Sequence, residues 1–92
     1  MSVLDDVKAA LRVTGDDHDA LLTRLIASGL AEFNTFAGGN PAGSADAIPA
    51  DAFTGLVLMV RADFDGDPEK RNAYRAGAIS LWRDYRANAG GL

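Results

Sequence analysis

The sequence predicts an all-α fold, a small bundle of about four helices with one exposed loop at residues 38–48. Apolar residues recur at intervals of three and four, alanine occurs seventeen times, and alternating runs of Val, Ile and Thr are lacking. The chain has 92 residues, enough for one domain with a modest core and too few for two. We expect a single helical domain at 1–87 and a flexible C-terminal tail at 88–92.

The first helix is expected at about residues 3–12. Leu4, Val7 and Leu11 recur at helical spacing, so they can place one face of this helix on a core. Gly15 should then break the helical pattern, because glycine adopts turn conformations easily.

The second helix should begin at residues 16–19, which carry three carboxylates and one histidine. Carboxylates favour the start of a helix, so we interpret this cluster as a cap. Four adjacent side chains point in different directions there, which disfavours a cation site. The helix should end at Gly38-Gly39. Its expected apolar face consists of Leu22, Leu25, Ile26, Gly29, Phe33 and Phe36.

The third helix is expected at 49–64, with Pro49 at its first helical position. Apolar residues occupy almost every side of it, which predicts the central and most buried element. Phe53, Val57 and Val60 should lie at the centre of the bundle.

The fourth helix should run from about residue 68 to 86, with Asp67 as its cap. Asp63, Asp65 and Asp67 have the spacing of the first ligands of a calcium loop. The glycine and the acid that such a loop also needs are replaced by Pro68 and Tyr74, so a turn with a cap is favoured. The expected apolar side of the helix comprises Tyr74, Ala78, Leu81, Trp82 and Tyr85.

The composition argues against an enzyme. The chain has no cysteine and one histidine, His18, so a thiolate site or a zinc site with two histidines cannot be built. No serine lies in a nucleophile elbow, and no glycine-rich loop carries the lysine of a phosphate site. We expect no catalytic residues, no metal and no cofactor. The longest uncharged apolar stretch, 52–60, is far shorter than the ~20 residues of a membrane span.

The charges are unevenly distributed along a chain whose net charge is −4. Residues 1–67 hold eleven acids and four bases, which gives −7, whereas residues 68–92 hold two acids and five bases, which gives +3. This asymmetry suits head-to-tail contacts between copies or a basic helix on an acidic partner. A solvated helix face remains the alternative.

Trp82, Arg83, Tyr85 and Arg86 form the candidate subunit or partner interface. Tryptophan, tyrosine and arginine are the residue types enriched at interface hot spots. In the alternative interpretation, Trp82 and Tyr85 close the core of the domain and both arginines are solvated. The sequence leaves both interpretations open.

Several stretches are similar to one family: LDDVKAALR at 4–12, DALL at 19–22, the hydrophobic helix begun by Pro49, and LWRDYR at 81–86. In this order they resemble the small tailed-phage head–tail connector, or adaptor, proteins. The resemblance covers about residues 3–86.

The resemblance implies a structural role without catalysis. Such proteins are helical bundles that assemble as a ring of about a dozen subunits on the portal protein, a closed symmetric arrangement. The ring extends the DNA channel and presents a surface to the next head-completion or tail component. DNA would pass through without sequence-specific binding, and an acidic lumen would let it slide. The resemblance also implies a virion protein at the head–tail interface that is made in the host cytoplasm.

The alternative from another class is a small helical DNA-binding or regulatory module. The net charge and the lack of a short basic recognition helix after a tight turn weigh against it. Its best candidate is the last helix, with Lys70, Arg71, Arg75, Arg83 and Arg86.

Overall fold

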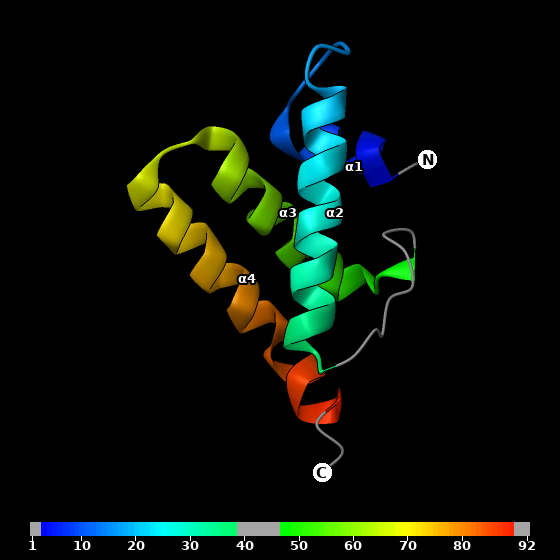
Figure 1. Cartoon of the computed structure of the whole chain (residues 1–92), viewed down its shortest axis with the longest axis vertical. Coiled ribbons are helices and arrows are strands. Elements are labelled where there is room, and N and C mark those ends of the chain that lie inside the picture. The colour runs from blue at the N-terminus through cyan, green and yellow to red at the C-terminus, as the bar shows by residue number, and fades with distance from the viewer. Residues whose placement is uncertain (1–2, 39–46, 90–92) are drawn as a thin grey trace.

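The computed structural model describes residues 3–38 and 47–89, and these residues form helices and short connections without strands (Figure 1). The predicted all-α bundle is confirmed. The molecule extends over 44 × 30 × 17 Å, so its thinnest direction is less than about two helix diameters. The helices are α1 (Val3–Leu11), α2 (Asp19–Phe36), α3 (Ala50–Asp65) and α4 (Pro68–Ala89).

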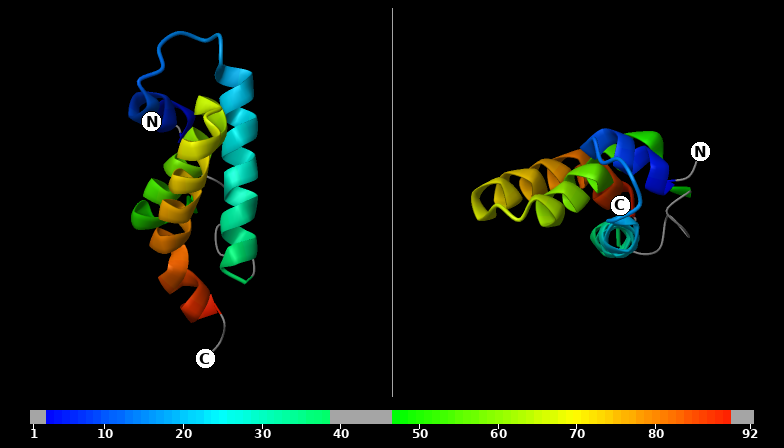
Figure 2. Two further views of the ribbon diagram at one scale, coloured as in Figure 1. Left: turned by 90° about the vertical axis from the view of Figure 1, so that its left-hand side faces the viewer. Right: turned by 90° about the horizontal axis from the view of Figure 1, so that it is seen from above.

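The helices pack around α3, which contacts all three others. α3 and α4 form an antiparallel hairpin, α2 crosses α3, and α1 lies near the start of α2 (Figures 1 and 2). The central position expected for the third helix is therefore confirmed. Because the molecule is thin, each long helix keeps one side at the surface.

Two apolar clusters form the core. One joins α2, α3 and α4 around Phe33 and Trp82, and the other joins α1, α2 and α3 around Val7 and Leu56. The stripes expected for the first two helices are confirmed, with Val7 and Leu22 inaccessible to solvent.

The inward face of α3 differs from the expected one. Val60 is buried as predicted, but Phe53 and Val57 are only half-buried. Leu56 and Met59 take the central positions, because α2 and α4 both pack against their side of α3.

The turn between α3 and α4 has the expected cap. Gly66 closes α3 with a positive φ of 72°, a conformation that glycine adopts without steric cost. The Asp67 carboxylate accepts the backbone N–H groups of Glu69 at 3.0 Å and Lys70 at 3.4 Å. The interpretation of this acidic stretch as a turn and cap is confirmed.

The cap expected at 16–19 is wrong. His18 occupies the N-cap of α2 without a side-chain hydrogen bond to the helix. The Asp19 carboxylate instead lies 2.7 Å from Nζ of Lys8 in α1. This hydrogen bond, with the nearby Asp16 charge, raises the pKa of Lys8 above its ordinary value. The carboxylates therefore attach α1 to α2 rather than cap α2.

Four other expectations need correction. Pro49 is the N-cap of α3 with an extended ψ of 150°, so the helix begins one residue later than expected. Ile48, at the end of the expected exposed loop, is half-buried against both clusters, whereas residues 39–46 lie outside the described residues. Leu81 is 45% exposed instead of facing the core. α4 extends through Ala89, and residues 90–92 of the expected tail also lie outside the described residues.

Candidate functional site

Trp82 lies in the core of the domain. Its side chain is fully buried, and its Nε1–H donates a hydrogen bond of 3.0 Å to the carbonyl oxygen of Ala52 in α3. Its ring meets the ring of Phe33 at a centroid distance of 5.2 Å. Of the two interpretations left open by the sequence, the structure therefore supports the one in which Trp82 closes the core.

Tyr85 continues this attachment one turn later. Its ring packs edge-to-face on Phe33 at 5.4 Å, and its hydroxyl donates a hydrogen bond to the carboxylate of Asp51 in the first turn of α3. This hydrogen bond lowers the pKa of Asp51 below its ordinary value of 3.8. Tyr85 thus ties the C-terminal part of α4 to the start of α3.

The lowered pKa of Asp51 predicts an acid-dependent stability. Above the ordinary pKa, Asp51 is ionised in both states and the Tyr85 bond contributes fully, but this contribution is lost as the pH falls through the folded-state pKa. Tyr85→Phe should lower stability at neutral pH, and its difference from the wild type should shrink at acidic pH. Urea unfolding across a pH series measures this. Tyr74→Phe is the matched control, and an equally pH-dependent effect there would contradict the assignment.

Of the four predicted interface residues, Arg83 is seen at the surface. Arg86 lies within α4, but its side chain is outside the described residues. The structure thus separates the set into one core residue, Trp82, one half-buried residue packed against the core, Tyr85, and one exposed arginine.

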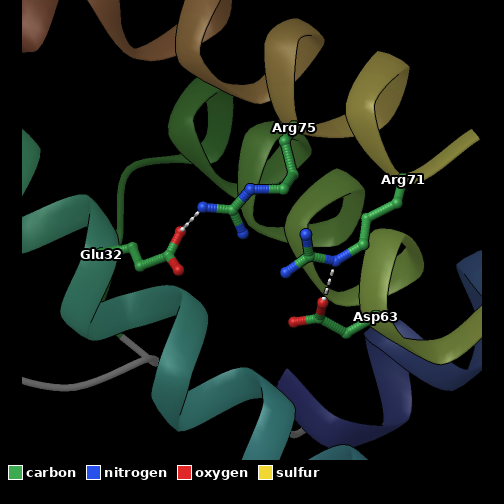
Figure 3. Close-up of polar contacts among 4 residues, drawn as sticks. All are labelled: Glu32, Asp63, Arg71 and Arg75. Atoms are coloured by element: carbon green, nitrogen blue, oxygen red, sulfur yellow. Dashed lines mark hydrogen bonds and ion pairs between the residues drawn. The ribbon is translucent and has the colours of Figure 1, made fainter. Parts of the chain in front are cut away.

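Two other arginines of α4 pair with acids of their own chain (Figure 3). Arg71 Nε lies 3.0 Å from the Asp63 carboxylate, and Arg75 Nη2 lies 3.0 Å from the Glu32 carboxylate of α2. Part of the positive charge of this helix is therefore balanced within the same chain. This leaves less of it for an acidic partner or for DNA phosphates than the sequence suggested.

An apolar groove of about 450 Å³ opens between α2 and α4, with α3 as its floor. The Glu32–Arg75 pair lies among its walls, and Ile79 is 40% exposed at its edge. The groove could not be predicted from the sequence, because three helices contribute to it. The one sequence feature that pointed to it was Ile79, an apolar residue outside the core stripe of α4. The lining residues are Ser28, Ala31, Glu32, Thr35, Phe36, Met59, Arg75, Ile79 and Trp82.

Among the described residues, no group of three or more His, Cys, Asp or Glu side chains is arranged to hold a metal ion. In the same residues, no helix has the length and hydropathy needed to cross a bilayer. The acids that drew attention in the sequence have structural partners instead, since Asp67 caps α4 and Asp19 pairs with Lys8.

The chain forms a thin helical domain with an apolar groove, and exposed apolar surface of this kind marks binding sites for proteins or for small ligands. A family model, described as phage gp6-like head-tail connector protein, matches residues 1–81. The chain belongs to this family, as its resemblance to head–tail connectors indicated, and it is a structural component of the phage virion. The match covers α1, α2, α3 and α4 up to the residue before Trp82. Searches of curated proteins and of solved structures gave no significant match.

Proposed function

We propose that the protein is one subunit of a ring of about a dozen copies that sits on the portal protein. Heterologous contacts between identical subunits generate such a ring when the rotation closes. The ring would extend the DNA channel and present a surface to the next head-completion or tail component. The family match over residues 1–81 carries this proposal. The protein would be made in the host cytoplasm and carried in the virion at the head–tail interface.

The charges of the subunit support passage of DNA without binding. The net charge of −4 disfavours adhesion to phosphates, and both Arg71 and Arg75 are held by acids of the same chain. No observation favours the alternative DNA-binding module. The proposed role is structural, so it needs neither a catalytic group nor a cofactor.

We further propose that the C-terminal part of α4 carries the contact with the portal or the neighbouring subunit. Arg83 is exposed there, and Arg86 follows it by three residues in α4, which makes the two positions neighbours on the helix surface. A guanidinium at the edge of a protein contact can pair with a carboxylate of the partner through two parallel hydrogen bonds.

Replacing both arginines tests this role. Arg83→Ala/Arg86→Ala should leave the fold nearly intact; the Arg83 change is at an exposed position, where substitutions usually alter stability by less than about 0.5 kcal/mol. Negative-stain microscopy and sedimentation of the wild type, alone and with the portal, should show rings, and the double variant should form fewer. Phage carrying the double variant should yield heads without tails. Lys70→Ala, an exposed base at the other end of α4, is the matched control. Normal tail joining by the double variant would contradict the proposed contact, and a wild type that never assembles would contradict the ring.

A further inference from the structure

Two of the exposed apolar side chains lie on opposite edges of α4. Among the described residues, the large apolar side chains at the surface are Leu21, Ile79 and Leu81, with exposed fractions of 44%, 40% and 45%. Ile79 and Leu81 are two positions apart, which places them on nearly opposite sides of a helix, about 160° from each other. α4 therefore presents one apolar surface on each side.

The first surface is the groove between α2 and α4. Ile79 borders it, Phe36 and Met59 contribute further apolar wall, and the space of about 450 Å³ lies within the range of protein binding pockets, roughly 300–1,000 Å³. It can hold more than one aliphatic side chain. The surface is concave and mostly apolar.

The second surface, which we call the Leu81 edge, consists of Leu58, Tyr74 and Leu81. A Cβ atom on Gly77 would lie 3.3 Å from Leu58 Cδ1, so Leu58 packs beside α4 one turn before Leu81. Leu58 and Tyr74 are half-buried, whereas Leu81 stands out at 45% exposure. This surface offers an apolar projection instead of a recess.

The charged side chains that line the groove, and the described arginine beside the Leu81 edge, have partners within the chain. In the groove, Glu32 and Arg75 neutralise each other at 3.0 Å. At the Leu81 edge, Arg61 donates to the carbonyl oxygen of Ala10 at 3.0 Å and lies over the Tyr74 ring at 5.7 Å. Each surface thus matches a neutral apolar partner better than a charged one, and each matches the other.

A ring needs two different complementary faces on every subunit, because a heterologous contact repeats the same pair of faces around the axis. We infer that the Leu81 edge of one copy docks into the groove of the next copy, with Leu81 entering beside Ile79. This inference rests on the proposed ring and names the two faces that would build it. The contact buries apolar surface, so it should persist at an ionic strength of about 1 M, where charges are screened within about 3 Å.

The test uses two single variants of the full chain, each of which places a glutamate on one of the two faces. Ile79→Glu blocks the groove and keeps the Leu81 edge, whereas Leu81→Glu does the reverse. Each variant alone should sediment as a monomer at concentrations where the wild type associates. An equimolar mixture should form a dimer that grows no further, because only one intact pair of faces remains. Leu21→Glu, equally exposed but on neither face, is the matched control and should assemble normally.

A second measurement exploits the absence of cysteine from the chain. Ile79→Cys and Leu81→Cys, mixed and treated with a short bis-maleimide, should give a cross-linked dimer, which neither variant should give alone. A chain that carries both Ile79→Cys and Leu81→Cys, once it has assembled on the portal, should give a ladder of cross-linked products.

The outcomes separate the docking mode from the ring itself. Normal assembly of both glutamate variants, or a mixture that stays monomeric while the wild type associates, would overturn the docking mode and leave the ring standing. Loss of wild-type association at high ionic strength would also overturn it. A wild type that stays monomeric both alone and with the portal would overturn the ring and the docking mode together.

Discussion

Trp82→Ala should cost about 3–5 kcal/mol of stability, the range for removing a large aromatic side chain from a core. The side chain is fully buried, contacts Phe33 and Phe36, and uses its Nε1–H on the carbonyl oxygen of Ala52. The whole free energy of unfolding of a small domain is about 5–15 kcal/mol, so the variant should be close to unfolded. Urea unfolding followed by circular dichroism measures the loss.

Two further variants separate a core role from an interface role. Trp82→Phe keeps most of the apolar contact and removes the hydrogen bond to Ala52, so it should retain more stability than alanine does. Leu81→Ala changes the exposed neighbour and should cost less than about 1 kcal/mol. If Trp82→Ala kept wild-type stability and lost only assembly, Trp82 would be an interface residue after all.

Features that depend on neighbouring residues were predictable from the sequence. Asp67 precedes the proline that starts α4, and its carboxylate accepts bonds from residues two and three positions later, which is the local geometry of a cap. Gly66 ends α3 for an equally local reason, its positive φ. The apolar stripe of α2 needed only the helical period.

Features that depend on distant residues were not predictable in this way. The carboxylate of Asp19 resembles a cap in the sequence, yet Lys8 reaches it from another helix. The inward face of α3 depends on where α2 and α4 cross it, so Leu56 replaces Val57 at the centre. The groove requires three helices at once, and no spacing within one helix indicates it.

The role of Trp82 was undecided for the same reason. Its spacing with Tyr85 fits a core face and a binding face equally well. What decides between them is Gly55, which lies 27 residues before Trp82 in the sequence and whose missing side chain leaves room for the indole.

Gly55→Ala should therefore destabilise the protein, although alanine is the better helix former by about 1 kcal/mol. A Cβ atom there would lie 2.3 Å from Trp82 Nε1 and 2.9 Å from Cδ1, so the rigid indole must move and its bond to Ala52 must weaken. Overpacking of this kind costs about 1–3 kcal/mol and the lost bond about 1 kcal/mol, which exceeds the gain in helix propensity. We expect a net loss of about 1–3 kcal/mol in urea unfolding.

Gly29→Ala is the matched control, because it adds the same methyl group at another helix crossing. Its Cβ would lie 2.6 Å from Leu56 Cδ1, the end of a side chain that can rotate away, so stability should change by less than about 1 kcal/mol. Trp82 is the sole tryptophan, and its fluorescence should shift to longer wavelength in Gly55→Ala and stay unchanged in Gly29→Ala. A Gly55→Ala protein as stable as the wild type, with unshifted emission, would mean that the indole does not need this space, and Trp82 would again be available to a partner.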